Sequence, residues 1–266
     1  MTIDNPQNPW LLLEEELDAW QSAGRCASLW WRDDDAVAAG PSLDRLLRVC
    51  ADTGLLLAVV PAPLQASLTE AVAQAIEEKG PFVRVAQHGY AHINHAPRGQ
   101  GLGAWELGLH RGESAVLKDL DAGRKILESA FGKSFLPVLV PPWNHIAPQL
   151  HDAIAARGYR ALSTEGPRLA REWVPGLLSI NGHCDPIRWK GGARFAGESK
   201  TLKSLVEHLQ QRREGVVDSA EPTGFVTHHL DLDNEGWKFC EKLAQRINAH
   251  PGAVWVQPDE LFGEQA

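Results

Sequence analysis

The sequence predicts an α/β protein, a single distorted (β/α) barrel of about seven to eight parallel strands. About eight short apolar segments alternate with amphipathic helical segments along 266 residues, with no linker or internal repeat. The run over residues 55–60 is apolar throughout, which is typical of parallel strands buried on both faces. Acidic residues and histidines directly follow several such runs, where the carboxyl ends of parallel strands share one face. Repeated strand–helix alternation in a chain of this length favours a barrel over an open sheet.

The first elements are a helix over residues 9–23 and a strand over residues 28–32. The helix carries Leu13, Leu17 and Trp20 on one side, at the spacing of an amphipathic helix. We therefore predict that residues 1–27 form a helical extension packed on a barrel domain of residues 28–266.

The same patterns predict the remaining elements in order. Helices are expected at residues 42–53, 67–79, 113–131, 148–157, 200–213 and 235–249. Strands are expected at residues 55–60, 82–87, 137–140, 159–163, 177–180, 224–227 and 253–256. Gly54, Gly80 and Gly132 each follow a helix and indicate where it ends.

Composition and charge argue against several classes of function. The net charge is −8 with acids spread along the chain, so nothing favours binding to nucleic acid. The longest apolar stretch, residues 54–63, is too short to span a bilayer, and residues 1–5 show no secretory signal. The four cysteines form no CxxC pair and read as free thiols. We expect a cytoplasmic protein with a small-molecule or carbohydrate substrate, no nucleic-acid partner and no membrane partner; a homo-oligomer is left open.

Two polar clusters predict a metal site. Asp33-Asp34-Asp35 follows the apolar strand that contains Trp30 and Trp31, and His88 and His92 follow another strand in a loop that contains Gly89. Two histidines and one aspartate form a ligand set that leaves coordination positions open for water and substrate. A second aspartate, left free of the metal, can take a proton from the attacking water.

The order and spacing of these clusters resemble the polysaccharide deacetylase (NodB-homology) superfamily, of the carbohydrate esterase family 4 type. Residues 31–35 match the central pair of the family's Thr-Phe-Asp-Asp-Gly, and residues 88–92 match His-Ser/Thr-x-x-His with Gly89 in the hydroxyl position. Residues 140–144 follow Arg-x-Pro-x-Gly with two changes, and residues 225–228 match Leu-x-x-His in spacing. The motifs come in family order and span about residues 28–260.

The resemblance implies roles for individual residues. Asp33 would be the general base, and Asp34, His88 and His92 would hold one divalent metal ion. We expect zinc, with cobalt, manganese, nickel or iron as alternatives. His228 would be the general acid that protonates the departing amine.

Two alternatives stay open at this point. A shift by one residue would make Asp34 the base and Asp35 the ligand, and His229 could replace His228. The family arginine that tethers the catalytic aspartate is Val140 here, and Arg32 could supply the missing positive charge. Residues expected to contact the substrate are Pro142, Trp143, Asn144, Asp185, Trp189 and His229.

The resemblance implies a metal-dependent hydrolase that removes an acyl group, N-acetyl above all, from a sugar or small amide. It would be a deacetylase or amidase acting on C–N bonds other than peptide bonds. Two other functions fit parts of the pattern. The loss of the motif arginine at Val140 would suit a non-catalytic carbohydrate-binding relative. The ligand set also serves non-haem iron oxygenases, although that function leaves the second aspartate and His228 without a role.

Overall fold

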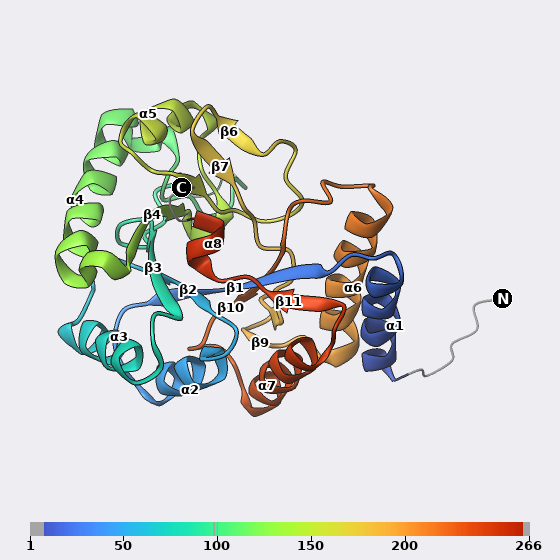
Figure 1. Ribbon diagram of the computed structural model, residues 1–266. Helices are drawn as coiled ribbons and strands as arrows, with labels where there is room; N and C mark the ends of the chain where they lie inside the picture. The colour runs from blue at the N-terminus through green and yellow to red at the C-terminus, as the bar shows by residue number, and fades with distance from the viewer. Residues whose placement is uncertain (1–7, 98, 100, 263–266) are drawn as a thin grey trace.

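The computed structural model describes residues 8–97, 99 and 101–262, and its centre is a curled, mostly parallel sheet (Figure 1). Its strands, in spatial order, are β10 (Thr223–Thr227), β1 (Ala27–Ala36), β2 (Leu55–Val59), β3 (Val83–His88), β4 (Phe135–Val140), β5 (Ala161–Leu162), β7 (Leu177–Ser179) and β6 (Glu172–Val174). β11 (Ala253–Trp255) pairs with the start of β1. A parallel bridge between Cys184 and Phe225 brings the segment after β7 back to β10. The expected distorted barrel of parallel strands is confirmed.

Helices surround this sheet in Figure 1. They are α1 (Pro9–Ser22), α2 (Pro41–Cys50), α3 (Ala66–Lys79), α4 (Glu113–Phe131), α5 (His151–Ala156), α6 (Glu198–Glu214), α7 (Asn234–Ala249) and α8 (Pro258–Phe262). All seven expected helices and all eight expected strands are present, with ends displaced by a few residues. The sequence patterns missed β6, the hairpin β8 (Ile187–Arg188) and β9 (Arg194–Phe195), and α8, because two to five residues are too few to establish a period.

The expected N-terminal extension is described from residue 8, and residues 1–7 lie outside the described part of the chain. α1 packs along α6, and it buries Trp10, Leu13, Leu17 and Trp20 in the same apolar cluster as β1 and α7. Among the described residues, no helix combines the length and apolar character needed to cross a membrane.

The alternation of side chains along β1 determines which groups enter the barrel. Trp30 belongs to the apolar cluster inside the barrel, together with residues of β2, β3 and β4. Trp31 belongs to the cluster between the sheet and the outer helices. Because successive side chains of a strand point to opposite faces, Arg32 and Asp34 share the inner face with Trp30, and Asp33 shares the outer face with Trp31.

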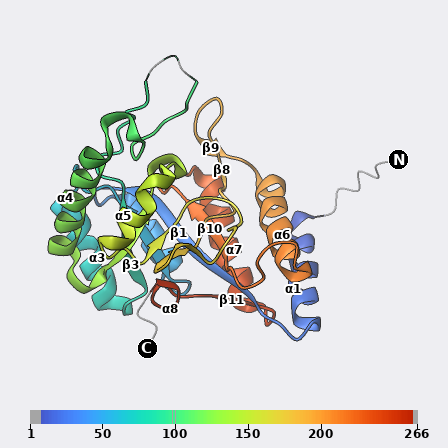
Figure 2. The same cartoon turned by 90° about the horizontal axis from the view of Figure 1, so that it is seen from above.

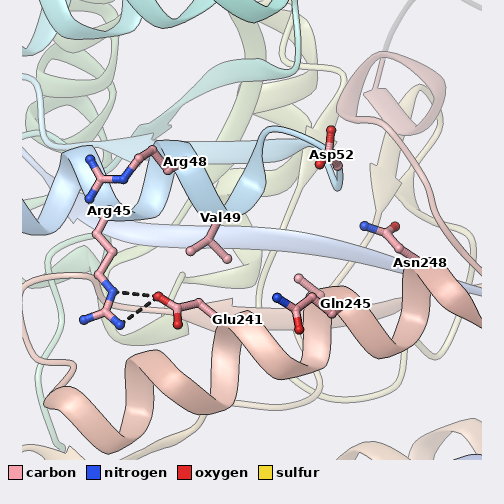
Figure 3. A pocket seen from close by; sticks show the side chains of 8 residues that line it. Arg45, Arg48, Val49, Asp52, Glu241, Gln245 and Asn248 are labelled. Carbon is pink, nitrogen blue, oxygen red and sulfur yellow. Dashed lines mark hydrogen bonds and ion pairs between the residues drawn. The ribbon is translucent and has the colours of Figure 1, made fainter.

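The helical layer also has a hollow between α2 and α7, shown in Figure 3. In this hollow the Arg45 guanidinium pairs with Glu241 at 2.7 Å, and Arg48 and Asp52 also line it. Because this hollow lies on the outer helices, it is separate from the polar residues that follow the strands.

Candidate metal and acid–base site

The polar residues that follow β1, β3, β4 and β10 converge at the carboxyl ends of these strands. The segment that leads out of β3 and the β8–β9 hairpin project on the same side of the molecule (Figure 2). A hollow of about 410 Å³ lies at these strand ends, and its lining includes Arg32, Asn144, Glu165, His183, Asp185 and His228.

Three side chains form a group with the composition of a metal site: Asp35, His88 and His92. Asp35 Oδ1 lies 3.1 Å from His88 Nε2 and 3.2 Å from His92 Nε2. These separations are close to those between ligand atoms around one tetrahedral ion, about 3.3–3.4 Å for bonds of about 2.0–2.1 Å. The three groups therefore fit a metal such as zinc.

The hydrogen bonds of His88 strengthen this fit. Its Nδ1 lies 2.9 Å from the Val140 carbonyl oxygen and must carry a proton to bond to it. In neutral His88 the Nε2 lone pair then faces Asp35 Oδ1, a buried oxygen that can only accept. Two lone pairs at this distance repel each other unless a proton or a cation lies between them. This arrangement, with Nδ1–H on a carbonyl, is typical of metal-binding histidines.

Backbone strain is concentrated around the same group. Among described residues, the non-glycine residues with positive φ are Asp35, His92, Trp143 and Asn144, at 56–71°. The β1–β2 register also shifts between Asp33 and Ala36, so Asp35 departs from the regular strand and turns toward the histidines. The Trp143 ring packs on His92, with 4.3 Å between centroids. Left-handed conformations cost energy for such residues and are found preferentially at functional sites.

Asp34, the expected ligand in the first alignment, instead pairs with Arg32. Arg32 Nε lies 2.9 Å from Asp34 Oδ1, and Nη2 lies 3.0 Å from Oδ2, so the pairing is bidentate. Both side chains are buried, and Arg32 also donates to Ser163 and to Asn144 Oδ1. Arg32 thus supplies a positive charge beside the aspartates, as expected from the loss of arginine at Val140.

His228 faces Asp34 across the hollow. Its Nε2 lies 4.0 Å from Asp34 Oδ2, and its Nδ1 lies 3.9 Å from Asp185 Oδ2. Trp189 donates its indole N–H to Asp185 and packs edge-on against the His228 ring. Burial raises the pKa of Asp185, although the nearby His228 partly offsets this effect.

Asp33 and His229 form a separate pair on the outer face of the sheet. His229 Nδ1 lies 2.5 Å from Asp33 Oδ1, and the Thr227 hydroxyl donates to Asp33 Oδ2 at 2.6 Å. Trp31 donates to the same hydroxyl. Asp33 and His229 therefore lie away from their chain neighbours Asp34 and His228, which face each other.

The other expected substrate contacts differ in exposure. Asn144 lines the hollow and Trp189 is about half exposed, whereas Pro142 is buried against Gly89. Glu106 was not singled out from the sequence because it lies in no motif. It is buried, and its carboxylate accepts the backbone N–H groups of Tyr90 and Ala91, inside the loop between the two histidines.

A second group of metal-ligand type, His183, His208 and Glu221, has a different character. His183 Nδ1 accepts the backbone N–H of Gly224, so the ring proton must lie on Nε2, which faces Glu221 at 3.5 Å. No nitrogen lone pair of His183 is then free to bind a metal. We interpret this group as a buried hydrogen-bonding support behind the hollow.

Comparisons with known proteins place the chain by its fold. No family model matches the sequence, and no curated protein matches it. A putative polysaccharide deacetylase from Mycobacterium smegmatis is 14% identical with a TM-score of 0.61, over 89% of this chain and 88% of that one. The Bc1960 peptidoglycan N-acetylglucosamine deacetylase, in complex with 4-naphthalen-1-yl-N-oxidanyl-benzamide, is 14% identical with a TM-score of 0.53 over the same shares. The catalytic domain of a peptidoglycan N-acetylglucosamine deacetylase from Eubacterium rectale is 13% identical with a TM-score of 0.53, over 87% and 89%.

Proposed function

We propose that this chain, which has the polysaccharide deacetylase (NodB-homology) fold, is a metal-dependent hydrolase that removes an acyl group from an amine. The expected substrate is an N-acetylated sugar or another small amide. The observation that carries the proposal is that a metal-type group and a separate aspartate–histidine pair lie together at the carboxyl ends of the strands, where His228 of the pair lines the hollow. The metal-type group is Asp35, His88 and His92, and the pair is Asp34 and His228.

The geometry supports the shifted alignment of the aspartates. In it, Asp35, His88 and His92 hold the metal, with zinc suited to two imidazoles and a carboxylate. Asp34 is the base, since Arg32 holds it within reach of the hollow and apart from the histidines. His228 is the acid, since it faces the hollow, whereas His229 faces Asp33.

A divalent metal at this site would acidify a water molecule and polarise the acyl carbonyl. Asp34 takes the proton of the attacking water at Oδ2, while the Arg32 guanidinium holds the carboxylate in place. His228, with Nε2 4.0 Å from that oxygen, gives its proton to the amide nitrogen as the C–N bond breaks. Asp185 stabilises the protonated imidazole from the Nδ1 side. One water and one amide thus yield a carboxylic acid and an amine.

The same contacts weigh against the two alternatives. The non-catalytic interpretation rested on the missing arginine at Val140, and Arg32 provides a bidentate partner for Asp34. An iron oxygenase would give no role to the Asp34–Arg32 and His228–Asp185 pairs, which are built at the hollow.

Two neighbouring substitutions test the proposal sharply. Asp35→Asn should remove the bound metal, whereas Asp34→Asn should keep about one metal ion per chain and lose at least about 100-fold in turnover, the lower end of a general base's contribution. The measurements are elemental analysis of the purified protein and acetate release from N-acetylated chito-oligosaccharides and small aryl acetamides.

Asp52→Asn, on the outer hollow between α2 and α7, is the matched control and should change neither quantity. The proposal fails if the unaltered protein takes up none of zinc, cobalt, manganese, nickel or iron after reconstitution. It also fails if Asp34→Asn retains full turnover.

A further inference from the structure

We propose that Glu106 is a positioning residue for the metal site, holding the loop between His88 and His92 in its binding conformation through the backbone N–H groups of that loop. This inference rests on the proposed function and adds to it a residue that lies outside every motif. The hydrogen bonds of the Glu106 carboxylate go to the peptide groups between the two histidines.

The Glu106 carboxylate is buried and bonds to the loop between the two histidines. Glu106 is 1% exposed, and its two oxygens accept from Tyr90 N at 3.1 Å and from Ala91 N at 2.7 Å. A buried carboxylate is retained only where hydrogen bonds or charges compensate for its loss of water. Here the compensation comes from the loop itself, so loop and carboxylate depend on each other.

The Glu106 carboxylate also fits closely against Gly89. This residue has φ +56°, and a Cβ atom there would lie 2.0 Å from Glu106 Oε2 and 2.6 Å from Pro142 Cγ. Any side chain at position 89 would therefore displace the carboxylate from the loop. The position of the Glu106 carboxylate therefore requires glycine at position 89.

The backbone holds Glu106 in place on both sides. The next residue, Leu107, forms a bridge with Ile146 and accepts from Ala147 N at 3.0 Å. The preceding residue, Trp105, accepts from His95 N at 2.8 Å. The carboxylate thus couples the loop that carries His92 to the segment that follows Trp143.

A loop held in this way keeps His92 in a left-handed conformation that is unfavourable on its own. Without Glu106, the two N–H groups lose their acceptor and the loop can relax, so His92 leaves the position that faces Asp35. Residues that orient metal ligands typically contribute about 10–100-fold to metal affinity. We expect Glu106→Gln, which replaces one acceptor oxygen with an NH₂ group, to weaken zinc binding by about this factor.

The experiment is a zinc dissociation constant, measured by competition with a chromophoric chelator, on the full chain. Thermal unfolding of the metal-free protein is measured in parallel. A positioning role predicts a dissociation constant raised about 10–100-fold in folded Glu106→Gln protein. The exposed Glu113→Gln also removes one negative charge and should leave the constant unchanged.

Gly89→Ala provides a second approach, because it displaces the same carboxylate without removing it, and it should also weaken zinc binding. If Glu106→Gln does not fold, the zinc affinity of Gly89→Ala tests the inference. Zinc affinity equal to that of the unaltered protein in either folded variant overturns the inference, while the proposed function stands. If the unaltered protein binds no metal at all, the proposed function itself has failed.

Discussion

His88 and His92 approach the same oxygen, Asp35 Oδ1, but the pKa of His88 is raised and the pKa of His92 is lowered. Burial lowers the pKa of His88, yet the hydrogen bond to Asp35 and the charges of Asp34 and Asp35 outweigh it, so the pKa is raised. Burial and the neighbouring charge of His88 lower the pKa of His92, despite the opposing charge of Asp35. For Asp35, burial is opposed by the hydrogen bond and charge of His88, and its pKa is lowered. In the metal-free protein, a proton on His88 therefore occupies the place that a cation would take.

At the residue scale, this competition predicts a pH-dependent metal affinity. A raised pKa means that metal-free His88 keeps its proton to a pH above its ordinary value of about 6.5. Zinc must displace that proton, so affinity should increase as pH rises through the raised pKa. Chelator competition between about pH 5.5 and 8.5 measures this dependence, and calorimetry in buffers of different ionisation enthalpy counts the protons released. An affinity that stays constant over this range, with no proton release, would contradict the prediction.

At the element scale, the strands explain what the sequence could and could not predict. The eight strands were readable because each is an apolar run, and their parallel order made the convergence of the clusters predictable. The assignment among Asp33, Asp34 and Asp35 was not, because three equal residues fit the motif in two alignments. Alternation from Trp30 places Arg32 and Asp34 together, but Asp35 joins the site only through a register shift and a φ of 71°. Backbone irregularities of this kind leave no pattern in the residue types.

The Asp33–His229 pair joins the ends of β1 and β10 behind the site, and it yields a stability prediction. Burial lowers the pKa of His229, but the charge and hydrogen bond of Asp33 outweigh it and raise the pKa. A raised pKa in the folded state contributes stability that is complete below the unfolded value of about 6.5 and is lost as pH rises through the folded pKa. Asp33→Asn should therefore reduce the free energy of unfolding by about 3–5 kcal/mol near pH 6, the usual effect of breaking a buried pair.

Urea unfolding at several pH values measures this difference, which should become smaller as pH rises. Metal content should stay at the level of the unaltered protein, since Asp33 pairs with His229 and is not one of the three metal-type residues. If the loss of free energy of unfolding in Asp33→Asn grows as pH rises, the pair does not stabilise the protein through charged His229.

At the scale of the whole molecule, the two ends of the barrel serve different purposes. The carboxyl ends of the strands carry the hollow and the projecting loops (Figure 2). α8 lies across the barrel strands in Figure 1, and its Phe262 packs edge-on against Trp30 inside the barrel. Trp30 shares the inner face with Arg32 and Asp34, so the apolar core is continuous with the floor of the site.

This division predicts that α8 stabilises the barrel without changing the zinc affinity of the metal site. Phe262 is 1% exposed, and Phe262→Ala should reduce the free energy of unfolding by about 3–5 kcal/mol, because it removes a buried ring and leaves a cavity. Leu169→Ala, at a fully exposed side chain, is the matched control and should change it by no more than about 0.5 kcal/mol. The zinc dissociation constant of folded Phe262→Ala protein should equal that of the unaltered protein, because the three ligands lie at the opposite ends of their strands. A weakened zinc affinity in that variant would show that strain passes along the inner face of β1, from Trp30 to the aspartates.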